Sequence, residues 1–363
     1  MVNYEGLIEN LREHGEPFGL LTMQATSTTR RLMQAMPDKL KCLFSAEQGF
    51  FGTGDGTGAW HHFWNRPIHS ICSQTKITDA MFEGIGRVVI DLCDIGVRCY
   101  PYLSTLKLAL EECAKRGLPV TLLDRQIPLG GMLDGPMRKP AYASPLAPIN
   151  VPFCHGMTPG ECAEWIRRAE DLELDLTIIK LDGWSHADRE PWANFIPPSD
   201  AISSWDSAAT FPMTVFADAC PSVDCGQGGA LAYRVLGAPW MDQQGFVRDL
   251  APGLASCGVG MRPYRYQPAQ GRYRGQHLNG ILFSITNAKA FYPVTAGMLV
   301  FTALIQRHGT KAIADMNAKL LDRLNGSNEI RETLDHGELG DLFQSWIDAQ
   351  DEFLKTKVDL YCD

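Results

Sequence analysis

The sequence of 363 residues contains no run of about 18 apolar residues, which is the length that a membrane-spanning helix needs. We therefore expect no transmembrane helix. The stretch MVNYEGLIENLREHGEP at the amino terminus also lacks a basic segment followed by an apolar one, so we expect no signal peptide and a cytoplasmic protein.

Cationic side chains are scarce relative to anionic ones. The chain has 33 Lys and Arg against 42 Asp and Glu, a formal net charge of −9. Nucleic-acid binding requires clustered cations, so this balance argues against it. An apolar content of 45% with 21% charged residues is ordinary for a globular protein, and the length favours two domains.

The eleven cysteines are an odd number and show no framework of paired spacings. Cys42, Cys93 and Cys113 lie inside apolar segments, where a thiol packs as a small hydrophobic group. This distribution favours a reducing compartment over a disulfide-bonded fold.

Metal-binding motifs are also missing. His61 and His62 are adjacent and lack the i, i+4 spacing of a helical ligand pair, and Cys220 and Cys225 have no second cysteine pair. We therefore expect no metal and no cofactor. The aromatic residues beside the histidines favour a wall for a ligand or a partner-binding patch; they are Trp60, Phe63 and Trp64.

Short apolar runs alternate with helix-like segments in the first half of the chain. Strands buried on both faces and separated by helices predict a parallel α/β sheet of the Rossmann-like type, with helices on both faces. We expect this domain over residues 1–185 and a smaller α+β domain over 186–363, with a cleft between them. The predicted strands of the first domain are 18–23, 39–45, 87–96, 119–125 and 176–184.

Polar residues follow several of these strands directly. Glu47 follows the second strand, Asp91 and Asp94 follow the apolar part of the third, and Asp124 and Arg125 follow the fourth. Ligands of open α/β sheets bind beyond the carboxyl ends of the strands. These side chains therefore predict a site at one edge of the sheet.

Six motifs, spread in order along nearly the whole chain, carry a resemblance to one family. They are LFSAEQGFFG (43–52), DLCDIGVRCYPYLSTL (91–106), LLDRQIPLGG (122–131), HGMTPGE (155–161), FIPPSD (195–200) and GAPWMD (237–242). Together they resemble the exo-β-N-acetylmuramidase (NamZ-like) glycoside hydrolases of peptidoglycan recycling.

The resemblance implies roles for the polar positions of these motifs. Glu47, flanked by phenylalanines, becomes the catalytic acid, with the alternative that it caps a helix or pairs with an arginine. Asp94 and His155 join it as catalytic candidates; His155 contacts substrate or carries a proton. The implied substrate-binding residues are Asp91, Arg98, Tyr100, Asp124, Arg125, Asp200 and Gln227.

Structural alternatives stay open for two of these motifs. Asp94 and Arg98 form either a sugar-positioning pair or an ion pair that holds a turn. Thr158 followed by Glu161 also has the pattern of a capping box at the start of a helix.

The chain departs from the family pattern at several polar positions. Gln48 and Phe51 stand where the family has His and Arg, and Ile127 stands where it has Asn. The largest change is in 224–229, where Cys225 and Gln227 replace a Glu and an Arg. Glycosidases generally require two carboxyl groups, so Asp218 or Asp224 is a candidate for the lost one.

Three functions remain open at this point. The first is removal of terminal N-acetylmuramic acid from small glycans. The second is a repurposed member that performs non-hydrolytic biosynthetic chemistry, such as ring closure by displacement of an anionic leaving group, possibly with a partner subunit. The third is a non-catalytic binding subunit; a homo-oligomer is compatible with each.

Overall fold

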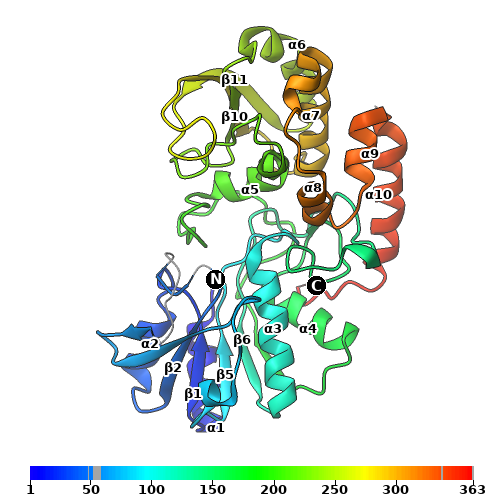
Figure 1. Ribbon diagram of the computed structural model, residues 1–363. Helices are drawn as coiled ribbons and strands as arrows, with labels where there is room; N and C mark the ends of the chain where they lie inside the picture. Colours follow the sequence, from blue (N-terminus) through cyan, green and yellow to red (C-terminus); the bar gives the residue numbers. More distant parts are fainter. Residues whose placement is uncertain (48, 52–58, 337, 362–363) are drawn as a thin grey trace.

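The structure, a computed structural model, describes residues 1–47, 49–51, 59–336 and 338–361. Gln48 and the glycine-rich segment 52–58 lie outside the described residues. The N-terminal half of the chain forms the lower lobe in Figure 1, and most of the C-terminal half forms the upper lobe.

The lower lobe is built on a mostly parallel sheet. Seven strands of the described chain form it in the order β3-β4-β2-β1-β5-β6-β9. Neighbouring strands are parallel except β3 and β4, which are antiparallel. The predicted α/β fold is therefore confirmed. The strands are β1 (Phe18–Leu21), β2 (Leu40–Ser45), β3 (Trp60–His61), β4 (Arg66–Ser70), β5 (Arg87–Ile90), β6 (Val120–Leu123) and β9 (Leu176–Ile179).

Helices cover both faces of this sheet, because its central strands are apolar on both sides. Helices α1 (Tyr4–His14) and α2 (Thr28–Ala35) bury apolar side chains in one core together with Leu20 and Val89. Helices α3 (Pro101–Arg116) and α4 (Pro159–Ala169) pack on each other in the core that includes the neighbouring strand residues Leu21 and Val88. Alternate strand residues thus serve opposite faces.

The upper lobe contains a smaller antiparallel sheet, in the order β10-β12-β11, and a set of helices. Its strands are β10 (Val235–Ala238), β11 (Val259–Tyr266) and β12 (Leu278–Ile285). The helices of the second half of the chain are α5 (Trp205–Thr214), α6 (Gln243–Ser256), α7 (Pro293–His308), α8 (Ala318–Asn325), α9 (Glu329–His336) and α10 (Leu339–Leu354).

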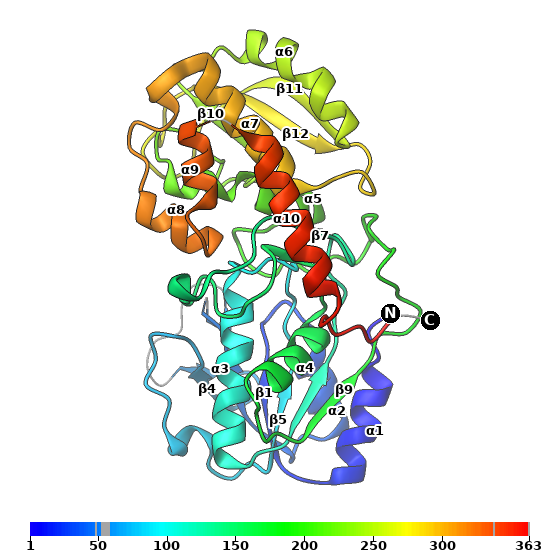
Figure 2. The same ribbon diagram turned by 90° about the vertical axis from the view of Figure 1, so that its right-hand side faces the viewer.

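The carboxyl-terminal part of the chain returns to the lower lobe. Helix α10 runs down from the upper lobe (Figure 2) and contacts β7 (Leu133–Asp134), which pairs with β8 (Cys154–His155). The Gln350 side-chain amide donates to the Gly135 carbonyl at 3.1 Å. Residues after 338 therefore belong to both lobes, and the division at 185/186 stays a prediction.

The structure also bears on the expected membrane spans and on the cysteines. No helix of the described residues is long and apolar enough to cross a membrane. Ten cysteines in the described ranges carry free thiols, and all but Cys72 and Cys257 are buried.

Candidate active site

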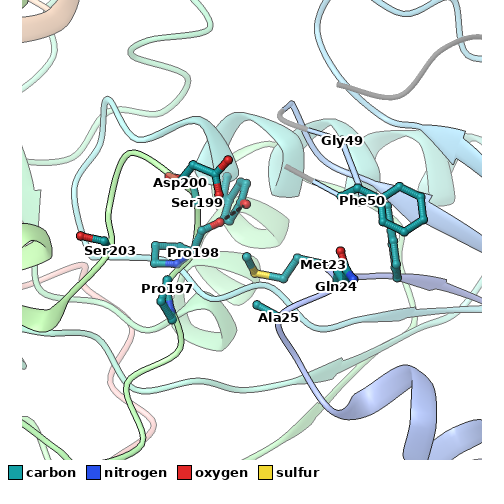
Figure 3. A pocket seen from close by; sticks show the side chains of 12 residues that line it. Met23, Gln24, Ala25, Gly49, Phe50, Pro197, Pro198, Ser199, Asp200 and Ser203 are labelled. Carbon is teal, nitrogen blue, oxygen red and sulfur yellow. Dashed lines mark hydrogen bonds between the residues drawn. The ribbon is translucent and has the colours of Figure 1, made fainter. Parts of the chain in front are cut away.

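A cavity of about 690 Å³ lies beyond the carboxyl ends of β1 and β2. Figure 3 shows the segments that meet there: the turn after β1, the residues after β2 and the stretch 197–203 that precedes α5. This is the edge at which open α/β sheets bind ligands, and the volume is in the range of small-molecule sites. The lining residues are Met23, Gln24, Ala25, Gly49, Phe50, Phe51, Tyr102, Pro197, Pro198, Ser199, Asp200 and Ser203.

Glu47 is not among the residues that line this cavity; it precedes Gly49, which does line it, by two residues. Its carboxylate Oε1 accepts hydrogen bonds from the Ser73 backbone N–H at 3.0 Å and from the Ser73 hydroxyl at 2.9 Å. These two donors fix the carboxyl group at the end of β2. The general-acid role of Glu47 stays a prediction, and Ser73 is a positioning residue that the sequence did not indicate.

Asp94 follows β5 and lines a smaller cavity of about 60 Å³ that shares Pro198 with the larger one. Burial raises the pKa of Asp94 to about 6, although backbone N–H groups of the following turn oppose the shift. One of these donors, the Gly96 N–H, lies 2.8 Å from Oδ1. Asp94 therefore takes up a proton more readily than an ordinary aspartate, although it is still largely ionised at pH 7.

Asp91 and Arg125 form a buried ion pair at the same edge. Arg125 Nε lies 2.6 Å from Asp91 Oδ1, and its Nη2 lies 2.9 Å from Oδ2. The Thr28 hydroxyl also donates to Oδ2, at 2.5 Å. Burial opposes the charge of Arg125, but the Asp91 carboxylate holds its pKa above the usual value. The charge of each side chain is therefore paired with that of the other, and Arg125 lines the small cavity.

Asp124 joins the amino end of α4 to the chain terminus. It accepts hydrogen bonds from the Thr158 hydroxyl and the Gly160 N–H, both at 2.7 Å, and from the Tyr361 hydroxyl at 2.5 Å. Burial raises the pKa of Asp124 to about 6 against these donors. A Cβ on Gly160 would lie 2.7 Å from the carboxyl group, so only glycine permits this approach.

Arg98 and Tyr100 lie in the interior. The guanidinium of Arg98 is fully buried and donates to backbone carbonyls, those of Pro136 at 2.9 Å and of Asn325 among them. It therefore forms a bridge between distant segments, and no ion pair joins it to Asp94 in the described residues. The Tyr100 hydroxyl lies 3.0 Å from Ser199 Oγ, and so supports a segment that lines the cavity.

His155 is also buried, at 1% exposed, and lines neither cavity. Its Nδ1 accepts the Met157 N–H at 3.3 Å, and the Cys162 thiol lies 3.7 Å away. Burial, with the nearby charges of Lys357 and Arg98, lowers the pKa of His155 to about 3. The imidazole is neutral at ordinary pH, and its role as a proton carrier stays a prediction.

The Thr158–Glu161 pattern forms the predicted capping box. Thr158 accepts the Glu161 N–H, and Glu161 Oε2 accepts the Thr158 N–H at 2.8 Å. The donor atoms of Glu161, His186 and Asp359 lie within 4.8 Å of one another, so this group has the donor set of a metal site. Glu161 Oε1 already accepts the Leu360 N–H at 2.8 Å. This hydrogen bond attaches the segment around Leu360 to the start of α4.

The two remaining predicted residues lie apart from each other. Asp200 lines the large cavity. Gln227 lines a separate cavity of about 380 Å³ in the upper lobe, and its amide donates to Asp218 at 2.6 Å and to the Tyr233 hydroxyl at 2.8 Å. Burial raises the pKa of Asp218 to about 6. Tyr233 has φ 62°, a backbone strain of the kind found at functional sites.

The site thus combines carboxyl groups with a cavity at the edge of a parallel sheet, an arrangement suited to acid–base chemistry on a small molecule. The chain belongs to the NamZ family. The family models described as "Exo-beta-N-acetylmuramidase NamZ, N-terminal" and "C-terminal" match residues 18–206 and 209–361. This membership supports an enzyme of the glycosidase type.

Individual relatives agree with this assignment. Peptidoglycan beta-N-acetylmuramidase NamZ of Bacillus subtilis is 27% identical over 361 residues, covering 94% of this chain and 86% of the relative. A crystal structure of a DUF1343 family protein from Bacteroides fragilis has a TM-score of 0.86 at 25% identity, with 98% of each chain covered. A second such protein has a TM-score of 0.76 at 18% identity, with 96% covered, and shows the fold alone.

Proposed function

We propose that this protein is an exo-acting glycoside hydrolase that removes a terminal N-acetylmuramic acid residue from small glycans. The observation that supports the proposal is the cavity of about 690 Å³ at the sheet edge, one wall of which begins at Gly49, two residues after Glu47. Ser73 holds the Glu47 carboxylate through two hydrogen bonds. The 27% identical relative bears the name of a β-N-acetylmuramidase, which gives the substrate class.

In this mechanism Glu47 is the general acid. It donates its proton to the glycosidic oxygen as the bond from that oxygen to the anomeric carbon breaks. Water then adds to the anomeric carbon and gives up one proton to the Glu47 carboxylate, which restores the acid. Asp200 at the cavity wall positions sugar hydroxyls. Asp94, whose pKa is raised to about 6 and which lines the small cavity, is the second carboxyl group. Two carboxyl groups are the usual requirement of glycosidases.

The test is release of a chromogenic leaving group from a β-N-acetylmuramic acid glycoside. The wild type is expected to release it, and Glu47→Gln is expected to lose at least a hundredfold in rate, the usual contribution of general acid catalysis. Glu13→Gln on the exposed side of α1 is the matched control and keeps the wild-type rate. Equal rates for wild type and Glu47→Gln would contradict the role of Glu47.

A second candidate follows from the charge of the cavity. Its described lining contains the carboxylate of Asp200 but no Lys, Arg or His, whereas muramic acid carries a carboxylate of its own. Phe51 stands where the family resemblance places an arginine. This wall favours a substrate without an anionic group, and with it the repurposed, non-hydrolytic chemistry in which Glu47 serves as a base. Absence of release by a folded, monodisperse wild type would favour this second function.

A further inference from the structure

Aromatic side chains are concentrated at the surface beside the large cavity. Phe51 is 43% exposed and Phe63 is 79% exposed, although burying such rings on folding would be favourable. Their rings are connected: Phe51 to His61 with centroids 5.7 Å apart, His61 to Trp64 at 6.2 Å, and Trp64 to Phe63 at 4.4 Å. We call Phe51, His61, Trp64 and Phe63 the aromatic strip.

The turn that carries the strip is held in place by hydrogen bonds. The Trp64 N–H donates to His61 Nδ1 at 3.3 Å. Arg66 donates to the Asn65 carbonyl at 2.8 Å and to the Pro37 carbonyl at 2.7 Å. Asn65 itself has φ 53°, a left-handed conformation that asparagine tolerates better than most residues. The backbone that carries these rings is therefore held in place, which reduces the entropy cost of binding a ligand.

The strip is continuous with the cavity through Phe51, which belongs to both. A ligand whose terminal group occupies the cavity would thus extend along the strip if it is longer than one unit. Contiguous exposed aromatic surface of this kind marks an interaction site.

The side chains of the strip offer no positive charge to pair with an anionic occupant. Burial and the charge of His62 lower the pKa of His61, although its backbone hydrogen bond opposes the shift, so the imidazole is neutral at neutral pH. The other three side chains carry no charge. A pyranose ring meets this surface well, because its apolar C–H face packs on aromatic rings while its hydroxyl groups remain in water.

We propose that the aromatic strip binds the leaving part of a glycan substrate, with successive neutral sugar rings stacked on Phe51 and the rings beyond it. This proposal rests on the proposed function for the placement of the terminal sugar in the cavity. It adds that the enzyme prefers oligosaccharides to isolated terminal sugars.

The experiment measures binding of chito-oligosaccharides of two to five N-acetylglucosamine units to the full chain by titration calorimetry. Because an aromatic contact contributes about 0.5–1.5 kcal/mol, affinity is expected to rise about two- to tenfold for each added unit that reaches the strip. Phe63→Ala is expected to abolish the rise for the longer chains. Trp60→Ala is the matched control, since Trp60 is 42% exposed but precedes His61 on β3 and points to the opposite face.

The other outcomes overturn either this proposal or the proposed function on which it rests. Affinity independent of length, or no binding at all, would show that the strip does not hold sugar rings. A sedimentation coefficient that falls in Phe63→Ala, without an effect on glycan binding, would make the strip a contact between copies of this chain. Length-dependent binding by a wild type that hydrolyses nothing would refute the proposed function and leave the strip intact.

Discussion

Replacing Arg125 by methionine tests whether the residue serves the fold or the substrate. Asp91 is 0% exposed and Arg125 is 5% exposed, and two charge-assisted hydrogen bonds of 2.6 and 2.9 Å join them. Methionine keeps most of the side-chain volume and removes the charge. Breaking one partner of a buried ion pair costs about 3–5 kcal/mol because the other charge is left uncompensated.

The assay is unfolding in urea, followed by circular dichroism and tryptophan fluorescence. With an m value of about 3 kcal/mol/M, the expected loss lowers the midpoint by about 1–2 M. Adding Asp91→Asn to Arg125→Met is expected to recover part of that loss, because the double variant has no unpaired buried charge. The cycle of both single variants and the double one isolates the pair interaction.

A loss below about 1 kcal/mol in Arg125→Met would refute this reasoning. If glycan binding fell while stability stayed, Arg125 would be a substrate contact, as the family resemblance implies. A folded variant with unchanged binding and a lowered midpoint would assign the residue to the fold.

Two further predictions concern buried hydrogen-bonding groups. The pKa of His155 is about 3 in the folded protein against 6.5 normally, so the unfolded chain takes up a proton first as the pH falls. The contribution of His155 to the free energy of unfolding is therefore complete above about pH 6.5. It declines toward pH 3, by about 2 kcal/mol at pH 5. The difference in unfolding free energy between wild type and His155→Gln should shrink by that amount from pH 7 to pH 5, and a difference independent of pH would contradict it. Tyr361→Phe removes the 2.5 Å hydrogen bond to buried Asp124 and should cost about 1–3 kcal/mol in thermal unfolding, whereas Tyr292→Phe, at an exposed position, should not; an unchanged melting temperature in Tyr361→Phe would mean that the terminus does not dock there.

The strands and their common edge were predictable from the sequence because both depend on local patterns. Apolar runs predicted β1, β2, β5, β6 and β9, although the predicted strands 87–96 and 176–184 extend beyond β5 and β9, which end at Ile90 and Ile179. The polar residues that follow parallel strands must then lie at one edge.

The partners of those polar residues were not predictable, because they depend on contacts between distant parts of the chain. The Asp91–Arg125 pair spans 34 residues, and the contact of Arg98 with the Asn325 carbonyl spans 227. Ser73, which holds Glu47, lies in a segment without any motif. Tyr361 reaches Asp124 only because α10 returns to the lower lobe.

Positions that match the family pattern lie both in the interior and at cavity walls. Asp91, Arg98, Asp124 and His155 match it and are buried with partners inside the protein, whereas Asp94 and Arg125 match it and line the small cavity. Of the positions that depart from it, Ile127 is also buried, but three others line cavities: Phe51, Cys225 and Gln227.

The interior positions that match the family pattern resist change for a physical reason. A change at an interior position leaves a buried donor or acceptor without its partner, which costs stability whatever the substrate. A change at a cavity wall alters only what is bound. The retained interior residues of this chain therefore support the fold, whereas the replaced residues at cavity walls bear on its substrate. Phe51 has the clearest consequence among them: it joins the cavity to an uncharged aromatic surface.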